Sequence, residues 1–157
     1  MPELPEVETV RQGLSRLLVG KTVRGVKLYN SPRSFPNAPE QVEQFLYGAS
    51  VTVVRRRAKL LMIDLDSDYT LAIHLKMTGQ LVFVGSVSLG SISQSPQRSV
   101  ARARSSEDFT GGHPNDSLIG KLPDRSTRVE INFIDDSRLF FNDQRKFGWM
   151  QLMPTLE

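Results

Sequence analysis

The stretch TLAIHLKM, residues 70–77, alternates apolar and polar side chains along its whole length. The larger apolar side chains share one face, made by Leu71, Ile73, Leu75 and Met77. The other face carries Thr70, Ala72, His74 and Lys76. A period of two is typical of a half-buried β-strand. The stretch therefore predicts a strand on which His74 and Lys76 lie on the same face.

The same alternation recurs on both sides of this stretch. Residues 26–29 and 128–133 follow it, and polar turn segments at residues 66–68 and 135–137 separate the runs. Several short strands with few helices predict an α+β, mainly β fold, built as a sandwich or a barrel. Of the two, we expect a two-layer antiparallel β-sandwich.

Two helices are expected beside the strands. Near the N-terminus, Pro5 suits the first helical position, and Glu6 and Glu8 complement the positive end of the helix dipole. Apolar residues then recur at helical spacing until Gly20, at Val7, Val10, Leu14, Leu17 and Leu18. A second, short helix is indicated by Asn37 and Glu40, which have the spacing of a capping box. The sandwich should therefore be flanked by an N-terminal helix and a second short helix.

Composition excludes several classes of site. The chain has 157 residues, enough for one domain, and contains no cysteine and two histidines. Disulfides, zinc–cysteine sites, iron–sulfur clusters and thiol nucleophiles are therefore excluded from this segment. No apolar run approaches the roughly 20 residues that span a bilayer, and the polar start is unlike a signal peptide. We expect a cytoplasmic protein, whose net charge of +3 mildly favours a polyanionic partner.

Residues 85–112 break the strand pattern. They are rich in serine and glycine and contain Arg98, Arg102 and Arg104. Such a segment buries too little apolar surface to offset its ordering entropy, so a flexible insertion is expected there. Its arginines could contact phosphates, but an ordinary surface insertion is the preferred interpretation.

Four motifs occur in an informative order: MPELPEVETVRQGL at residues 1–14, RRRAKLL at 55–61, HLKMTGQL at 74–81 and FNDQRKFG at 141–148. Together they resemble the bacterial formamidopyrimidine-DNA glycosylase family. Leu4 favours this branch over endonuclease VIII, which typically begins Pro-Glu-Gly-Pro-Glu. The resemblance implies that residues 2–157 form the N-terminal catalytic domain of the family. The helix-two-turn-helix module and zinc finger that normally follow that domain are absent from this segment.

This resemblance implies base-excision repair of DNA. The family enzyme is a bifunctional glycosylase and abasic-site lyase that removes 8-oxoguanine and formamidopyrimidines. Its N-terminal proline, here Pro2 after removal of Met1, attacks C1′, forms a Schiff base and supports β,δ-elimination. An α-amino group titrates near pH 8, well below a lysine near 10.4, so a useful fraction is uncharged at neutral pH. Pro2 is therefore expected to be the nucleophile.

The resemblance also implies roles for the other site residues. Glu3 corresponds to the general acid/base at the sugar, and Glu6 to a residue that orders the site. Lys59 corresponds to a catalytic residue that also contacts the lesion phosphate. Without the flanking motif, Glu6 would be read as helix-dipole compensation, which remains our interpretation of Glu8. Contacts with DNA are expected from His74, Lys76, Met77, Asn142, Arg145 and Phe147. Of these, Met77 should enter the gap left by the extruded base, Phe147 should wedge between stacked base pairs, and Arg145 should pair with the orphaned base.

The expected partner is double-stranded DNA with oxidised bases or abasic sites, bound by a monomer near the bacterial nucleoid and not at a membrane. No cofactor or metal is expected in this segment, whereas one structural zinc is expected in the missing finger. The segment alone should bind DNA weakly and cleave little. Two alternatives remain open: an endonuclease VIII-like glycosylase for pyrimidine lesions, and a non-catalytic domain that binds damaged DNA.

Overall fold

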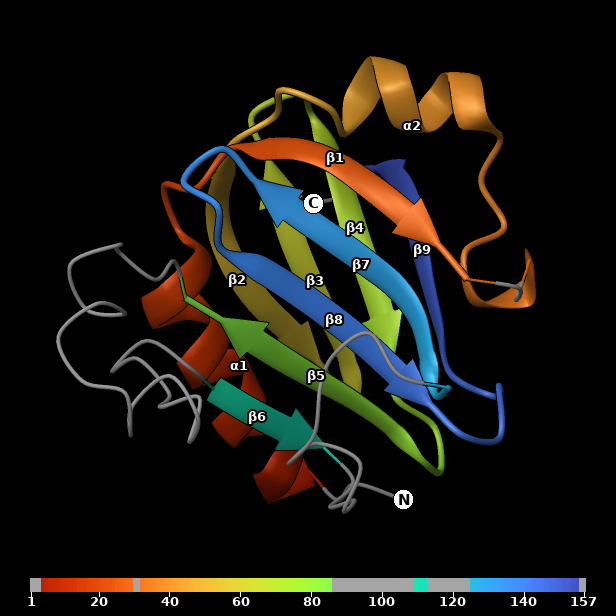
Figure 1. Ribbon diagram of the computed structural model, residues 1–157. Helices are drawn as coiled ribbons and strands as arrows, with labels where there is room; N and C mark the ends of the chain where they lie inside the picture. The colour runs from red at the N-terminus through yellow and green to blue at the C-terminus, as the bar shows by residue number, and fades with distance from the viewer. Residues whose placement is uncertain (1–3, 30–31, 86–108, 113–124, 156–157) are drawn as a thin grey trace, which may run out of the picture.

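The computed structural model describes residues 4–29, 32–85, 109–112 and 125–155. These residues form two α-helices, one short 3-10 helix and nine β-strands (Figure 1). The helices are α1 (Leu4–Leu18), η1 (Pro32–Ser34) and α2 (Pro39–Phe45). This is the α+β, mainly β composition that the sequence predicts.

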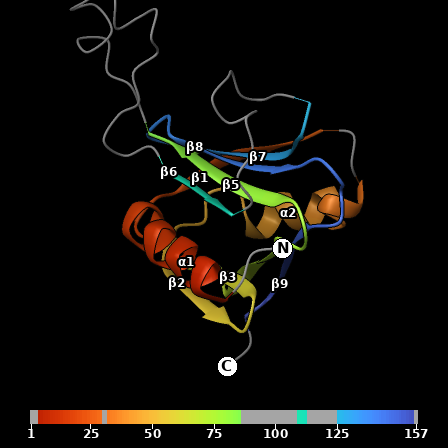
Figure 2. The same cartoon turned by 90° about the horizontal axis from the view of Figure 1, so that it is seen from below.

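The strands pair into two antiparallel sheets. The five-stranded sheet has the order β1 (Val23–Leu28), β7 (Thr127–Phe133), β8 (Arg138–Asp143), β5 (Gly79–Val84) and β6 (Phe109–Gly112). The four-stranded sheet has the order β2 (Val51–Arg57), β3 (Leu60–Leu65), β4 (Tyr69–His74) and β9 (Trp149–Pro154). Figure 2 shows the two sheets as separate layers. The two-layer sandwich is thereby confirmed, and the barrel is excluded.

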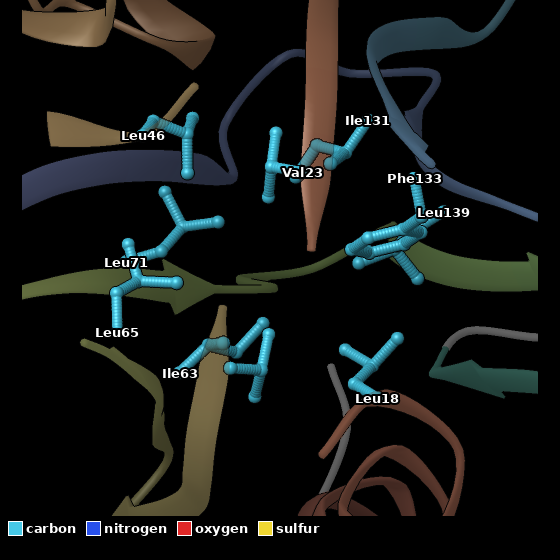
Figure 3. A pocket seen from close by; sticks show the side chains of 10 residues that line it. Leu18, Val23, Leu46, Ile63, Leu65, Leu71, Ile131, Phe133 and Leu139 are labelled. Carbon is cyan, nitrogen blue, oxygen red and sulfur yellow. The ribbon is translucent and has the colours of Figure 1, made fainter. Parts of the chain in front are cut away.

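The hydrophobic core fills the space between the layers. A cavity of about 10 Å³ remains at its centre, lined only by apolar side chains such as Leu18 of α1, Leu71 of β4 and Phe133 of β7 (Figure 3). This volume is close to that of a single water, which would find no polar partner there. The cavity is therefore a packing defect of the core and not a substrate pocket.

The two helices lie at opposite open sides of the sandwich (Figure 2). Helix α1 packs against the edge strands β2 and β6 and buries Val7, Val10, Leu14, Leu17 and Leu18, the stripe that the sequence predicts. Gly20 follows with a φ of +92°, in the left-handed region that glycine tolerates best. The predicted N-terminal helix, with its buried apolar stripe and its end before Gly20, is confirmed.

The capping box expected at α2 is wrong. The N-cap is Ala38, which makes no side-chain cap, and Pro39 occupies the first turn. Asn37 instead bonds to β9: its Nδ2 donates to the carbonyl of Leu152 over 2.7 Å, and its Oδ1 accepts from the Leu152 N–H over 2.7 Å. These two hydrogen bonds to β9 take the place of a local helix cap, and they anchor the start of α2 to the four-stranded sheet.

Two strand boundaries also differ from expectation. Strand β4 ends at His74, and Lys76 has a φ of 56°, so His74 and Lys76 do not continue on one strand face. Residues 109–112, expected within a flexible insertion over 85–112, form β6 and pair with β5. Residues 86–108 of that insertion lie outside the described residues.

Candidate functional site

Several expected site residues gather at one edge of the sandwich, the one where strands β2, β4 and β8 end. Lys59 lies in the β2–β3 turn, directly before Leu60, whose Cα partner on β4 is His74. His74 is in turn the Cα partner of Trp149, the first residue of β9. The β4–β5 and β8–β9 connections meet at the same edge, and α1 begins there (Figures 1 and 2). Residues far apart in sequence thus come together around the end of β4.

His74 is held at this edge in a defined chemical state. Its ring is half-buried and lies 6.0 Å from the ring of Trp149. The pKa of His74 is lowered from 6.5, first by burial and then by the positive charges of Lys76 and Lys59. Nδ1 accepts a 3.1 Å hydrogen bond from the Lys76 N–H, so the proton of the neutral ring is on Nε2. His74 is therefore a neutral donor beside two lysines.

Met77 lies in the β4–β5 connection and not on the core face. Its side chain is 45% exposed, whereas Leu71, Ile73 and Leu75 are buried. The positive φ of Lys76 breaks the strand and turns the chain, so the alternation that would carry Met77 inward is lost. An exposed apolar side chain at the functional edge is available to a partner.

The β8–β9 connection presents a second exposed apolar side chain. Phe147 is 55% exposed and follows Lys146, which has a φ of 61°; Arg145 is exposed beside them. Phe147 is therefore not part of the core. This loop displays a ring and a guanidinium at the same edge as Met77.

Asn142 lies in the interior of the five-stranded sheet. The side chain is 1% exposed on β8, and its Oδ1 accepts a 2.8 Å hydrogen bond from the Thr127 hydroxyl on β7. This burial gives no support to the expectation that Asn142 contacts DNA, which stays a prediction, because the motif that carries it begins with three residues of β8, Phe141, Asn142 and Asp143. Its neighbour Asp143 is the more informative residue.

Asp143, the last residue of β8, was not singled out by sequence. Its buried carboxylate accepts hydrogen bonds from the N–H of Arg145 (3.1 Å), the N–H of Gly148 (2.6 Å) and the hydroxyl of Thr78. The bond to Arg145 makes an Asx-turn, the one signal that an aspartate before a polar loop offers in sequence. The bond to Thr78 joins two loops that are far apart in the chain, and no local pattern reveals it.

Gly148 has a steric requirement. A Cβ at this position would lie 2.7 Å from the ring of Phe141 and 2.9 Å from the carbonyl oxygen of His74. The β8–β9 loop therefore returns directly against the end of β4, which fixes the loop of Phe147 relative to His74.

Of the N-terminal residues, Pro2 and Glu3 lie outside the described residues. Glu6 is exposed in the first turn of α1. Glu8 does more than complement the dipole: it pairs with Arg11 at 2.7 Å and with Arg56 of β2 at 2.8 Å. The helix is thus tied to the strand that leads to Lys59.

The basic residues near this edge divide into two groups. Arg55 and Arg56 are paired, with Asp64 and Glu8 respectively. Among the residues that the structure describes, the second group forms no salt bridge: Arg57, Lys59, Lys76, Arg145 and Lys146. A cluster of cations without carboxylate partners is the electrostatic footprint of an anion-binding surface.

The described residues contain no group of three or more His, Asp or Glu side chains placed to bind a metal. None of their helices has the length and apolar character needed to cross a membrane.

Comparison with known proteins gives consistent matches. The formamidopyrimidine-DNA glycosylase of Chloroflexus aurantiacus is 33% identical over 98% of this chain and 43% of its own length. The enzyme of that name from Jannaschia sp. is 36% identical over 99% of this chain and 46% of its own. The chain thus spans less than half the length of these curated relatives.

Solved structures agree in fold. Lactococcus lactis Fpg in complex with DNA containing an abasic site matches with a TM-score of 0.69 and 25% identity, over 98% of this chain and 44% of that chain. Its complex with Fapy-dG-containing DNA matches with a TM-score of 0.68 and 25% identity, over 98% and 44%. The model of the formamidopyrimidine-DNA glycosylase N-terminal domain matches residues 1–150. The chain therefore belongs to the formamidopyrimidine-DNA glycosylase family, of which it carries the N-terminal domain.

Proposed function

We propose that this chain is the catalytic domain of a bifunctional DNA glycosylase and abasic-site lyase of base-excision repair. Its substrates would be 8-oxoguanine and formamidopyrimidines in double-stranded DNA. The observation that carries the proposal is that cations with no salt bridge to any described residue lie at the same edge as two exposed apolar side chains, Met77 and Phe147. Cationic side chains bind DNA phosphates, and exposed apolar side chains can insert into the gap left by an extruded nucleotide.

The proposed chemistry begins at Pro2. With Met1 removed, the lone pair of the proline nitrogen attacks C1′ of the damaged nucleotide, and the C1′–base bond breaks as its electron pair leaves with the base. The departing base takes up a proton from water. Glu3 accepts the proton released by the proline nitrogen and delivers it to the sugar ring oxygen, so the C1′–O4′ bond breaks and the nitrogen lone pair forms the iminium bond to C1′. Loss of a C2′ proton then expels the 3′ phosphate, and a second elimination expels the 5′ phosphate. Glu6, in the first turn of α1, helps to order the site.

Contacts with DNA are assigned as follows. Lys59 binds the phosphate at the lesion, and His74 donates a hydrogen bond from its Nε2–H to a second phosphate, with Lys76 adding positive charge. Met77 and Phe147 fill the gap in the stack, and Arg145 bonds to the orphaned base. The exposure of Met77, Arg145 and Phe147, and the neutral donor state of His74, support these assignments.

The proposal extends to a structural zinc, the oligomeric state and the location. Since this chain has no cysteine, a zinc finger of the family's kind cannot be built from its residues. We place the structural zinc in the portion of the relatives that this chain does not span. A DNA-repair enzyme of this kind would act as a monomer at the bacterial nucleoid in the cytoplasm. The helix-two-turn-helix module would supply much of the DNA affinity, so residues 1–157 alone should bind DNA weakly and cleave little.

The test is a substrate panel with the protein as its gene encodes it. Duplexes containing 8-oxoguanine, formamidopyrimidine, thymine glycol or an abasic site are compared under single-turnover conditions. Faster excision of the purine lesions than of thymine glycol is expected. Preference for thymine glycol would favour a pyrimidine-lesion enzyme, and binding without excision of any lesion would make the protein a non-catalytic damage sensor.

A further inference from the structure

The carboxylate of Asp143 sits between the two loops that carry the exposed apolar side chains. From the β8–β9 loop it accepts the N–H groups of Arg145 and Gly148, which bracket Phe147. From the β4–β5 loop it accepts the hydroxyl of Thr78, which directly follows Met77. One side chain therefore bonds to both loops next to the residues that they display.

The surroundings of this carboxylate make the arrangement stiff. Asp143 is completely buried, and its main chain is bonded on both sides: its N–H donates to the Ser126 carbonyl over 2.8 Å, and its carbonyl accepts from Arg128 Nε over 2.9 Å. Hydrogen bonds to an ionised acceptor in a buried setting are stronger than those between neutral groups. The position of the carboxylate is thus fixed by β7 and β8, and it transfers that rigidity to the loops.

An amide could not replace the carboxylate. Oδ1 already accepts from two groups, and Oδ2 accepts from the Gly148 N–H. An asparagine offers one acceptor oxygen and one NH₂ donor. In either orientation, its NH₂ group would face at least one of the N–H groups of Arg145 and Gly148, which also donate. Aspartate is the residue of this size that can serve three donors at once.

We propose that Asp143 is a positioning residue that locks the Met77 loop and the Arg145–Phe147 loop into one rigid unit for insertion into DNA. This rests on the proposed function, in which Met77 and Phe147 fill the gap left by the extruded nucleotide and Arg145 bonds to the orphaned base. Both loops are set before DNA arrives, so the ordering cost of insertion is already met in the free protein. Thr78 is the partner that couples the second loop to the first.

The experiment compares Asp143→Asn and Thr78→Val with the unaltered protein, each as the gene encodes it. Asp68→Asn is the matched control, because Asp68 is exposed in the β3–β4 turn and its φ of 66° suits asparagine. Insertion is measured by the fluorescence of 2-aminopurine opposite a tetrahydrofuran abasic analogue in a duplex, at saturating protein. Covalent capture is measured by borohydride trapping on a single-stranded abasic oligonucleotide, which needs the nucleophile but no filling of a duplex.

We expect both site variants to lose most of the fluorescence change and to excise 8-oxoguanine from a duplex roughly 10- to 100-fold more slowly. Single-strand trapping should remain within about threefold of the unaltered protein, a separation that general loss of folding would not produce. Asp68→Asn should match the unaltered protein in every assay. If Asp143→Asn does not fold, Thr78→Val decides. It keeps the bonds from the Arg145 and Gly148 N–H groups to Asp143 and removes only the hydroxyl that donates to Asp143 and accepts from the Arg145 N–H.

Two negative results have different meanings. A folded Thr78→Val or Asp143→Asn protein with normal fluorescence change and normal duplex excision overturns the role of Asp143. Absence of any fluorescence change or trapping with the unaltered protein overturns the proposed function itself.

Discussion

Nε of Arg56 on β2 donates a 2.8 Å hydrogen bond to the carboxylate of Glu8 on α1. The same carboxylate accepts from Arg11 Nη2 over 2.7 Å and from Gln12 Nε2 over 3.0 Å. Because β2 leads into the turn of Lys59, the pair fixes the N-terminal helix relative to that lysine. Hydrogen bonds from Arg11, Arg56 and Gln12 lower the pKa of Glu8 from 4.5 to about 2.

This pair predicts a pH dependence of stability. The pKa of Glu8 is depressed in the folded state, so the unfolded chain takes up the proton first as the pH falls. The stabilisation is present above about pH 4.5 and is lost as the pH falls from 4.5 to about 2. In urea titrations at pH 7, Glu8→Gln should have a lower free energy of unfolding than the unaltered protein. This difference between the two proteins should shrink towards zero as the pH falls to about 2. Glu43→Gln, on the exposed face of α2, should unfold with the same free energy as the unaltered protein at both pH values. If Glu8→Gln were destabilised equally at pH 7 and pH 2, the account would be contradicted.

His74 should titrate abnormally. Its pKa is lowered by burial and by Lys76 and Lys59, and its Nδ1 is an acceptor. In long-range ¹H–¹⁵N NMR spectra the ring should titrate below pH 6.5 and carry its neutral-state proton on Nε2. Because the folded-state pKa is depressed, stability should fall as the pH drops below 6.5. A midpoint above 6.5, or the Nδ1–H tautomer, would be inconsistent with this geometry.

Two phenylalanines of one motif should behave in opposite ways. Phe141 is fully buried, so Phe141→Ala should cost about 3–5 kcal/mol of stability. Phe147 is 55% exposed, so Phe147→Ala should change stability by less than about 0.5 kcal/mol and yet slow duplex excision. Ile134→Ala is the matched control for loss of an exposed apolar side chain, since Ile134 is 62% exposed in the β7–β8 turn. Equal excision rates for Phe147→Ala and Ile134→Ala would argue against a wedge.

Gly148 should not tolerate a side chain. Its Cβ would lie 2.7 Å from the Phe141 ring and 2.9 Å from the His74 carbonyl, so Gly148→Ala should cost about 1–3 kcal/mol and displace the loop. Gly25→Ala is the comparison, because the nearest atoms to a Cβ there are 3.9 Å away, on Tyr47. Denaturation midpoints measure both variants, and equal midpoints would refute the steric requirement.

The sequence predicted the layers of this fold well. The period-two runs correspond to strands β1, β4 and β7, and the apolar stripe from Val7 to Leu18 is the buried face of α1. These succeed because periodicity reports burial directly. The pattern failed where tertiary contacts override local ones: Asn37 bonds to β9 and caps nothing, and the positive φ of Lys76 ends the alternation before Met77.

The site was predicted more unevenly. The motifs indicated the loops of Met77, Arg145 and Phe147, which the structure brings to one edge with Lys59 and His74. They also included Asn142, which is buried, and gave no weight to Asp143 and Glu8. Asp143 acts through its hydrogen bond with Thr78, and Glu8 acts through its hydrogen bond with Arg56, so each joins two separate elements. Such pairings depend on the folded topology and leave no spacing in the sequence.

The central claim is that a free proline nitrogen at position 2 captures the sugar of a damaged nucleotide. Borohydride reduction during reaction with an abasic-site duplex should give a covalent adduct, which tandem mass spectrometry should map to Pro2 in the protein as its gene encodes it. A variant with one extra residue retained before Pro2 should give no adduct, because its nitrogen lies in a peptide bond. An adduct that maps to a lysine, or that forms undiminished in the extended variant, would contradict the account.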